Sequence, residues 1–243
     1  MRILIVNDDG INAPALKELA KWAKKHGEVT VVAPKIEQSG KSHGIEIIKA
    51  MEILPVDLVE GVEAYSVDST PADCVRYGII GLKRDYDLVI SGINRGFNLG
   101  KDIVYSGTVG AVYESAGLGF KSVALSTAPH SLDLAIQQLD NVFDFFVQNK
   151  LFDHNIIYNV NLPDCEPKAI KITRTGDGYY SDDFEMVGNK MYLQVGKMIW
   201  NDTNNLELDT DAAMHGYISI TPLSSERTRL EVFNFLKRLN DVK

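Results

Sequence analysis

The chain has 243 residues, of which 45% are hydrophobic and 24% charged, and its formal net charge is -8. This composition is sufficient for a substantial buried core and excludes a largely disordered chain. The negative charge makes long nucleic acid a poor partner, so any binding of phosphate groups must be local. The two cysteines, Cys74 and Cys165, have neither zinc-ligand spacing nor the pattern of a disulfide framework, and we expect two reduced thiols.

The hydropathy pattern gives no sign of a membrane or secreted protein. The apolar run from Ile3 to Val6 is much shorter than the core of a signal peptide, and no later stretch approaches the length of a membrane span. We therefore expect a cytoplasmic protein with no membrane partner.

The first 155 residues alternate β-rich runs with amphipathic stretches of helical period. The expected strands cover residues 2–6, 29–33, 64–67, 88–91 and 122–126, and the expected helices cover residues 14–26, 71–82, 108–117 and 132–147. Asn12 or Ala13 is the expected cap of the first helix, Pro14 suits its first turn, and Gly27 is expected to end it. Strands that alternate with helices predict a Rossmann-like, doubly wound and mainly parallel α/β sheet.

The pattern changes after about residue 155. Residues 156–160, 169–173, 191–195 and 217–220 have β-like sequences, and residues 226–239 form a closing amphipathic helix. No Ser-rich or Gly-rich linker marks a boundary. We therefore expect one α/β domain over residues 1–243, with a core of about 1–155 and a β-rich extension of about 156–243 that ends in a helix.

Two adjacent carboxylates, Asp8 and Asp9, lie in the segment Asn7-Asp8-Asp9-Gly10 where the first strand ends. Ligands of open α/β sheets bind at the carboxyl ends of the strands. An oxygen-rich acidic pair at that place suits a hard divalent cation such as magnesium or manganese. Composition alone would equally fit a solvated Asx-Gly turn, and it is the position in the sheet that favours a metal site.

The loop after the second strand contains Gly40-Lys41-Ser42, which imitates the end of a phosphate-binding P-loop. A P-loop also needs a glycine where this chain has Lys35, and it must open a helix, whereas the β-like residues 45–48 follow here. The sequence therefore excludes a P-loop, and the absence of GxGxxG from the sequence removes support for a dinucleotide-binding enzyme.

The loop after the strand at residues 88–91 leads through Asn94 and Asn98 to Ser106, Gly107 and Thr108, just before an expected helix. Small residues at a helix start present free N–H groups and the positive end of the helix dipole, which suits a phosphate group. Plain capping of the helix remains the alternative for these three residues.

Several separate segments, in the same order along most of the chain, resemble the survival protein E (SurE) family of nucleotidases. The matching segments are residues 2–10 with NDDG, Val32-Ala33-Pro34 followed by Ser39-Gly40, residues 70–75, SGIN at 91–94, NLG at 98–100, YSGTVGA at 105–111 and GYISITPL at 216–223. The chain departs from the family pattern at Ser69, where Gly is usual, and at Glu46, where Thr is common, and the latter is a candidate for altered substrate preference.

The resemblance implies a metal-dependent phosphatase that hydrolyses nucleoside 5'-monophosphates. It implies one divalent cation per subunit, magnesium or manganese, held by Asp8, Asp9, Ser39 and Asn94. It also implies a homodimer or homotetramer formed by exchange of C-terminal segments, which would make the β-rich extension an oligomerisation arm.

Our hypothesis for the mechanism gives Asp8 a catalytic role in orienting the attacking water. Asn98, Ser106, Gly107 and Thr108 would bind the phosphate oxygens.

Two alternatives to this function stay open. One is a phosphatase with a covalent aspartyl-phosphate intermediate, although the DxD spacing of such enzymes is missing, and the other is a metal- and nucleotide-binding stress module without turnover.

Overall fold

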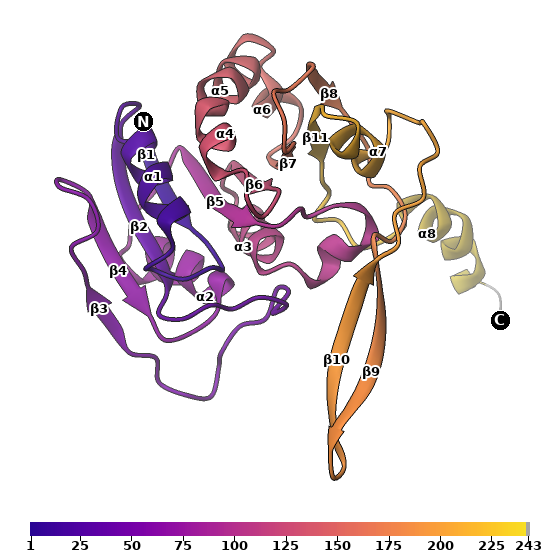
Figure 1. The fold of residues 1–243 in the computed structure, drawn as a ribbon, viewed down its shortest axis with the longest axis horizontal. Coiled ribbons are helices and arrows are strands. Elements are labelled where there is room, and N and C mark those ends of the chain that lie inside the picture. Colours follow the sequence, from indigo (N-terminus) through magenta and orange to yellow (C-terminus); the bar gives the residue numbers. More distant parts are fainter. Residues whose placement is uncertain (242–243) are drawn as a thin grey trace.

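The computed structural model describes residues 1–241 and contains a large sheet flanked by helices on both faces, with a separate two-stranded hairpin (Figure 1). The strands are β1 (Arg2–Val6), β2 (Glu28–Pro34), β3 (Ile53–Pro55), β4 (Glu63–Val67), β5 (Leu88–Arg95), β6 (Ser122–Thr127), β7 (Ile157–Leu162), β8 (Ile170–Ile172), β9 (Tyr180–Gly188), β10 (Met191–Met198) and β11 (Ile218–Pro222). The α-helices are α1 (Pro14–Ala23), α2 (Pro71–Arg76), α3 (Gly107–Gly117), α4 (Leu132–Gln137), α5 (Leu139–Gln148), α6 (Leu151–His154), α7 (Asp209–Met214) and α8 (Leu230–Leu236).

The nine-stranded sheet has the order β3-β4-β2-β1-β5-β6-β7-β11-β8. The six strands from β4 to β7 run parallel, whereas β3 pairs with β4 and β11 pairs with β7 in antiparallel fashion. This confirms the predicted doubly wound, mainly parallel α/β fold. Because β2, β1 and β5 are direct neighbours, the loops that follow these three strands meet at one edge of the sheet.

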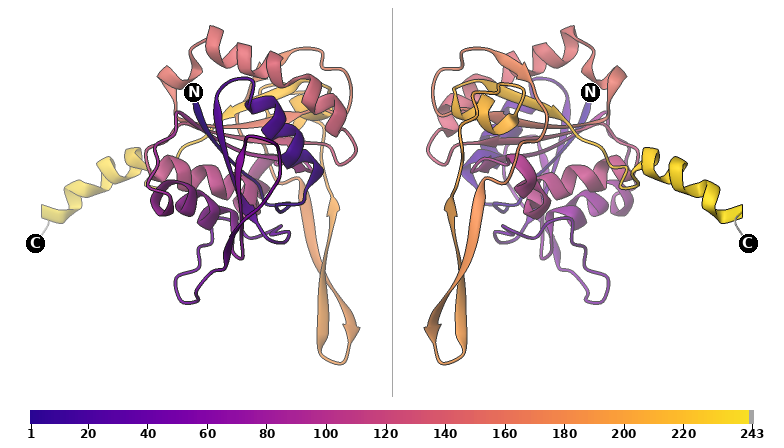
Figure 2. Two further views of the ribbon diagram at one scale, coloured as in Figure 1. Left: turned by 90° about the vertical axis from the view of Figure 1, so that its left-hand side faces the viewer. Right: turned by 90° about the vertical axis from the view of Figure 1, so that its right-hand side faces the viewer.

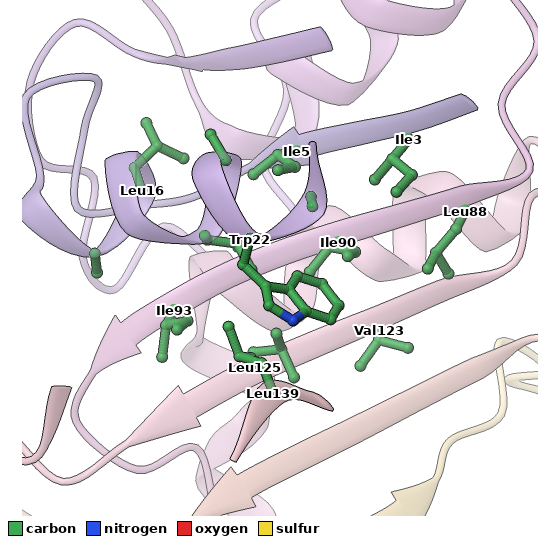
Figure 3. Close-up of a cluster of buried hydrophobic side chains, with 14 of the residues drawn as sticks. Ile3, Ile5, Leu16, Trp22, Leu88, Ile90, Ile93, Val123, Leu125 and Leu139 are labelled. Atoms are coloured by element: carbon green, nitrogen blue, oxygen red, sulfur yellow. The ribbon is translucent and has the colours of Figure 1, made fainter. Parts of the chain in front are cut away.

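Strand β1 shows how the sequence builds a core on each face. Ile3 and Ile5 pack toward α1, whereas Leu4 and Val6 pack toward the opposite face, as the period of two along a strand requires. All four side chains are buried, which is typical of a parallel sheet covered on both faces. Figure 3 shows Trp22 of α1 lying over this sheet near Ile90 and Leu125.

Four of the predicted helices have clearly different bounds in the structure, and the last of them, predicted over residues 226–239, is α8 followed by a 3₁₀-helical turn. Helix α1 ends at Ala23 rather than His26, because from Lys25 the backbone N–H groups bond three residues back, as in a tighter turn. The helix predicted over residues 71–82 is α2 followed by a π-helical turn, Tyr77–Gly81. The single helix predicted over residues 132–147 is divided into α4 and α5 at Gln138.

Several elements were not predicted, and one β-like segment is not a strand. Strands β3 and β9, helices α6 and α7 and a 3₁₀-helix, Gly100–Tyr105, have no counterpart in the sequence prediction. Residues 45–48 form an exposed loop rather than β structure, and Ile47 and Ile48 are 81% and 88% exposed. Their β-propensity has no effect because no neighbouring strand pairs with them.

The β-like sequences after residue 155 divide into two groups. Strands β7, β8 and β11 belong to the main sheet, and β9 and β10 form the antiparallel hairpin. The hairpin projects away from the sheet, and α8 projects in a different direction (Figures 1 and 2). No helix within residues 1–241 is long and apolar enough to cross a membrane.

The pairing between β5 and β6 contains an irregularity that matters for the site. The register shifts between Ser91 and Asn94, and Gly92 has a φ of 136°. A Cβ atom on Gly92 would lie 2.3 Å from the backbone oxygen of Leu125, so only glycine fits here. After this bulge β5 resumes pairing with Asn94 opposite Ser126, which carries Asn94 beyond the end of β1.

Candidate functional site

The predicted acidic pair lies in a pocket of about 330 Å³ at the carboxyl ends of β1, β2 and β5. The pocket is lined by Asp8, Asp9, Glu37, Ser39, Gly40, Asn94, Arg95, Phe97, Asn98, Asp102, Tyr105, Ser106, Tyr180 and Asp182. Six of the residues predicted for the site are therefore together in one pocket: Asp8, Asp9, Ser39, Asn94, Asn98 and Ser106. Gly107 and Thr108 follow Ser106 but are not among its lining residues.

Asp8 is buried, and its carboxylate is held by a residue of the predicted phosphate turn. Thr108 Oγ1 donates a hydrogen bond of 2.6 Å to Asp8 Oδ1. Burial is the main cause that raises the pKa of Asp8 from 3.8 to about 6, and the charge of Asp9 adds to it, while the Thr108 hydrogen bond lowers it. A cation placed beside this buried carboxylate would stabilise its charged form.

Asp9 is partly buried and lies beside Arg95. The backbone N–H of Arg95 donates to Asp9 Oδ2 at 3.3 Å, and Arg95 Nε lies 3.8 Å from Asp9 Oδ1. Burial raises the pKa of Asp9, Arg95 lowers it, and the charge of Glu37 raises it. Because the Arg95 side chain is half exposed, it neutralises Asp9 only in part and remains within reach of a ligand in the pocket.

Ser39 and Asn94 present oxygen atoms to the same pocket. The Ser39 hydroxyl donates to Glu37 Oε1 at 2.7 Å, which leaves the lone pairs of its oxygen available. Asn94 Nδ2 donates to the backbone oxygen of Gly96 at 2.8 Å. This bond fixes the orientation of the amide, so that Asn94 Oδ1 is the atom free to bind a cation.

The predicted phosphate turn is the start of α3. Ser106 is the N-cap of this helix, and its hydroxyl oxygen accepts a hydrogen bond from the backbone N–H of Val109 at 3.1 Å. Capping therefore does occur, as the alternative interpretation held, but the cap lies in the pocket. A Cβ atom on Gly107 would lie 3.0 Å from Asp8 Cβ, so glycine lets the helix start approach Asp8 closely. The hydroxyl of Thr108 is directed to Asp8 instead of the pocket.

Asn98 lines the pocket but is also part of a hydrogen-bond network with β6 and β7. Its side-chain Nδ2 donates to Ser126 Oγ at 2.8 Å, and its backbone oxygen accepts from the amides of Asn159 and Asn161. An amide nitrogen carries two hydrogens. Asn98 can therefore remain fixed by Ser126 and still donate one hydrogen bond to a phosphate oxygen.

The sequence prediction missed several residues of the pocket. Arg95 directly follows the predicted ligand Asn94 and supplies the pocket with its guanidinium group. Glu37 lies in the Ser39 loop, and its acidic side chain next to a predicted metal ligand was a usable signal. Tyr180 and Asp182 come from β9, more than 70 residues after the phosphate turn, and nothing in the local sequence indicates that this strand returns to the pocket.

The donor set of the pocket fits a divalent cation of the magnesium or manganese type. Two carboxylates, a hydroxyl and an amide oxygen are hard oxygen ligands. Burial is the largest cause of the raised pKa of both Asp8 and Asp9, and a cation bound beside them would favour their ionised forms. Among residues 1–239, whose side chains the structure describes, no group of three or more His, Cys, Asp or Glu side chains is arranged to hold a metal. A cation here therefore needs Ser39 and Asn94, or water, to complete its ligands.

A second cavity, of about 320 Å³, lies at the opposite end of the sheet, where residues that precede β1, β5 and β6 line it. Its walls are mostly apolar side chains of α1, α5 and the sheet, including Trp22, Val123 and Leu139 (Figure 3). Four charged residues, Asp87, Lys121, Lys150 and Asp153, also line it. The candidate site is placed in the acidic pocket, because six of the predicted site residues meet there.

The fold and the pocket define an α/β protein with an oxygen-rich acidic pocket at the carboxyl ends of a doubly wound sheet. The chain belongs to the SurE family, since the family model described as Survival protein SurE matches residues 3–182.

Individual relatives agree with this assignment over the full length of the chain. The 5'-nucleotidase SurE of Thermosipho melanesiensis is 39% identical and aligns with 99% of this chain and 97% of that protein. The 5'-nucleotidase SurE of Clostridium botulinum is 37% identical, with 98% and 99% covered. The crystal structure of the SurE protein from Aquifex aeolicus has a TM-score of 0.79 at 32% identity, and the match covers 99% of this chain and 100% of that one.

Proposed function

We propose that this chain is a 5'-nucleotidase that hydrolyses nucleoside 5'-monophosphates to a nucleoside and phosphate, with one divalent cation bound per subunit. Relatives that align with almost the whole chain carry the name 5'-nucleotidase. The observation in this molecule that carries the proposal is the convergence of Asp8 and Asp9 with the capping residue Ser106 in a single pocket.

Asp8, Asp9, Ser39 and Asn94 are the proposed ligands of the cation, which is magnesium or manganese. When bound, such a cation withdraws charge from the phosphoryl oxygens and lowers the pKa of a coordinated water. The pocket is lined by five carboxylates and one guanidinium group, so without the cation it would repel a phosphate dianion. Arg95 offsets part of this repulsion, and a bound cation would offset the rest.

Asp8 is the proposed residue that orients the attacking water. Its carboxylate is held by Thr108, which fixes one oxygen and leaves the group in a defined orientation. A carboxylate accepts a hydrogen bond from the water and so directs the oxygen lone pair toward phosphorus, in line with the leaving sugar oxygen. In this proposal Asp8 has two roles: it is a ligand of the cation, and it orients the attacking water.

The start of α3 and Asn98 are the proposed phosphate-binding groups. The hydroxyl hydrogen of Ser106 is free to donate, because its oxygen serves as the acceptor in the cap. Backbone N–H groups of Gly107 and Thr108 belong to the first turn of an eleven-residue helix, where the dipole favours negative charge. Donors held in place before the reaction stabilise charge that develops on the phosphoryl oxygens.

A covalent aspartyl-phosphate remains the alternative mechanism. Asp9 has the more exposed carboxylate of the pair, but its two oxygens face Arg95. Acid quenching during turnover of a substrate labelled in its phosphate group separates the two routes. Attack by an aspartate leaves the label on the protein as an aspartyl phosphate, which water then hydrolyses by attack at phosphorus, whereas direct attack by water leaves no labelled protein.

We also propose that the chain forms a homodimer or homotetramer through its C-terminal segments. Helix α8 extends away from the body of the molecule (Figure 2), and its large apolar side chains Leu230, Val232, Phe233, Phe235 and Leu236 are all exposed. The hairpin also exposes apolar side chains, including Phe184, Met186 and Leu193. Exposed apolar surface of this extent is typical of an interface between protein chains.

The proposed activity is tested by release of phosphate from a panel of nucleoside 5'-monophosphates with EDTA, Mg²⁺ or Mn²⁺. Release that depends on the added metal supports the proposal, and comparison with 3'-monophosphates tests the position of the phosphate. Metal-independent binding of nucleotides without any phosphate release would instead support a binding module.

A further inference from the structure

The root of the hairpin forms one wall of the pocket that contains the acidic pair. Tyr180, the first residue of β9, and Asp182 line the same pocket as Asp8 and Asp9. The pocket of about 330 Å³ is within the range of roughly 300–1,000 Å³ typical of sites for small organic ligands. It therefore has room for more than a phosphate group, and the hairpin side is where the rest of a substrate would lie.

The hairpin root is held by hydrogen bonds to the segment that leads into the phosphate turn. Asp102 Oδ2 accepts from the backbone N–H groups of Tyr179 at 2.6 Å and of Tyr180 at 2.8 Å. Asp102 lies in the 3₁₀-helix that ends one residue before Ser106. The position of Tyr180 is thus tied directly to the position of the phosphate-binding turn.

A second carboxylate strengthens this connection. Asp209 is fully buried, and its two oxygens accept hydrogen bonds from the backbone N–H of Gly176 at 2.7 Å and of Gly100 at 3.1 Å. One of these glycines precedes the hairpin and the other opens the 3₁₀-helix. The two carboxylates therefore connect the segment before the hairpin with the 3₁₀-helix at two places, which restrains the hairpin root relative to the pocket.

The ring of Tyr180 is braced and yet accessible. It lies 5.0 Å from the ring of Tyr179, centroid to centroid, at an interplanar angle of 75°, and Tyr179 is buried. Tyr180 itself remains 50% exposed. An aromatic side chain that is fixed on one side and open on the other provides a stacking surface for a planar base, and such stacking tolerates any base.

We propose that Tyr180 contacts the nucleobase of the substrate and that Asp102 is the positioning residue that holds it there. The proposal rests on the function proposed above and adds the part of the molecule that recognises the nucleoside. Stacking depends on the ring of Tyr180 and not on its hydroxyl group. The proposal therefore predicts that the protein selects nucleotides over phosphate esters without a base and discriminates only weakly among bases.

The test compares AMP with ribose 5-phosphate, which keeps the sugar and phosphate but lacks the base. Tyr180→Ala is expected to raise KM for AMP about tenfold, with kcat nearly unchanged and with ribose 5-phosphate unaffected. Tyr180→Phe keeps the ring and should behave like the wild type. Tyr192→Ala, at an equally exposed tyrosine of the same hairpin that does not line the pocket, is the matched control.

Asp102→Ala tests the positioning role with the same two substrates. It is expected to raise KM for AMP more than for ribose 5-phosphate, because the released hairpin root no longer holds Tyr180 in place. An equal loss on both substrates in Tyr180→Ala, or no loss on AMP, would overturn the proposal. If the wild type hydrolysed neither ester, the proposed function would fail instead. Binding of AMP and ribose 5-phosphate, measured by calorimetry with Mn²⁺, would then still decide the role of Tyr180.

Discussion

The hydroxyl group of Thr108 donates a hydrogen bond of 2.6 Å to the buried carboxylate of Asp8, and it thereby joins the start of α3 to the end of β1. The two residues are 100 positions apart in the sequence and belong to the two halves of the proposed chemistry. Thr108 belongs to the predicted phosphate turn, and Asp8 belongs to the acidic pair. The bond holds the carboxylate of Asp8 in place and lowers its pKa, against the larger effect of burial, which raises it.

Replacing Thr108 by valine should weaken metal binding in a pH-dependent way. The hydrogen bond lowers the pKa of Asp8, so its loss raises that pKa, and a metal needs the ionised carboxylate. The pH at which Mn²⁺ binding is half-maximal should rise by about 1 unit. Thr108→Ser keeps the donor and serves as the control. An unchanged pH profile in Thr108→Val would show that the bond does not control the ionisation of Asp8.

The raised pKa of Asp8 predicts that metal-free protein loses stability as the pH rises. Folding raises this pKa from 3.8 to about 6, so between these values the folded state keeps a proton that the unfolded state has released. The contribution of Asp8 to stability therefore falls as the pH increases from 4 to 6 and is lost above that.

Asp8→Asn removes the titrating carboxyl group. Comparison with the wild type therefore separates the pH-dependent contribution of Asp8 to stability from the contributions of other groups. The variant should be more stable than the wild type at pH 7.5 without metal, by on the order of 2 kcal/mol or about 5 °C in Tm, and about equal to it at pH 4. Saturating Mn²⁺ should raise the Tm of the wild type much more than that of the variant. Thermal unfolding at the two pH values, with EDTA or metal, measures this. A variant less stable than the wild type at pH 7.5 in EDTA would contradict the prediction.

Gly92→Ala should disrupt the candidate site by distorting the bulge in the pairing of β5 with β6. The new methyl group would lie 2.3 Å from the backbone oxygen of Leu125, at a φ of 136° that disfavours alanine. The bulge must then change, and Asn94 is displaced from the pocket. We expect a loss of several kcal/mol in the free energy of unfolding, roughly 2 or more, together with weaker metal binding.

Gly117→Ala, at the end of α3, provides the control for this substitution. A Cβ atom there meets nothing within 4 Å, so the change should be nearly neutral. Chemical denaturation of the three proteins gives the comparison. A Gly92→Ala protein as stable as the wild type would show that the bulge tolerates a side chain.

Removal of α8 should change the oligomeric state without unfolding the sheet. A chain that ends at residue 224 loses the exposed apolar residues of α8, whereas the last strand of the sheet, β11, ends at Pro222. We expect light scattering to give a smaller particle than for the full chain, with unchanged far-UV spectra apart from the lost helix. An unchanged mass would place the interface elsewhere, and the hairpin would then be the next segment to remove.

The fold could be predicted because its signals are local. The parallel strands have continuous apolar sequences, the helices between them have clear periodicity, and the acidic pair follows the first strand directly. The positions of Ser39 and Asn94 as ligands came from the family resemblance, since a serine and an asparagine in loops carry no distinctive signal of their own. The structure nevertheless brings both into the pocket with Asp8 and Asp9.

The remaining part of the pocket depends on long-range packing that the sequence does not reveal. Tyr180 lines the pocket, and its segment is held by hydrogen bonds to Asp102 and Asp209 that connect residues 78 and 33 positions apart. Likewise, the bulge at Gly92 moves Asn94 relative to β6, and a register shift of this kind follows from pairing rather than from propensity. These features decide which residues line the hairpin side of the pocket.

The most direct test of the central claim combines metal binding and turnover in one pair of variants. Asp9→Asn removes one carboxylate of the acidic pair, and Asp85→Asn makes the same chemical change at an exposed site outside the pocket. We would titrate each protein with Mn²⁺ by calorimetry and measure phosphate release from AMP on the same samples. The account predicts that Asp9→Asn loses both metal binding and activity while Asp85→Asn keeps both. Full activity with tight metal binding in folded Asp9→Asn would contradict it.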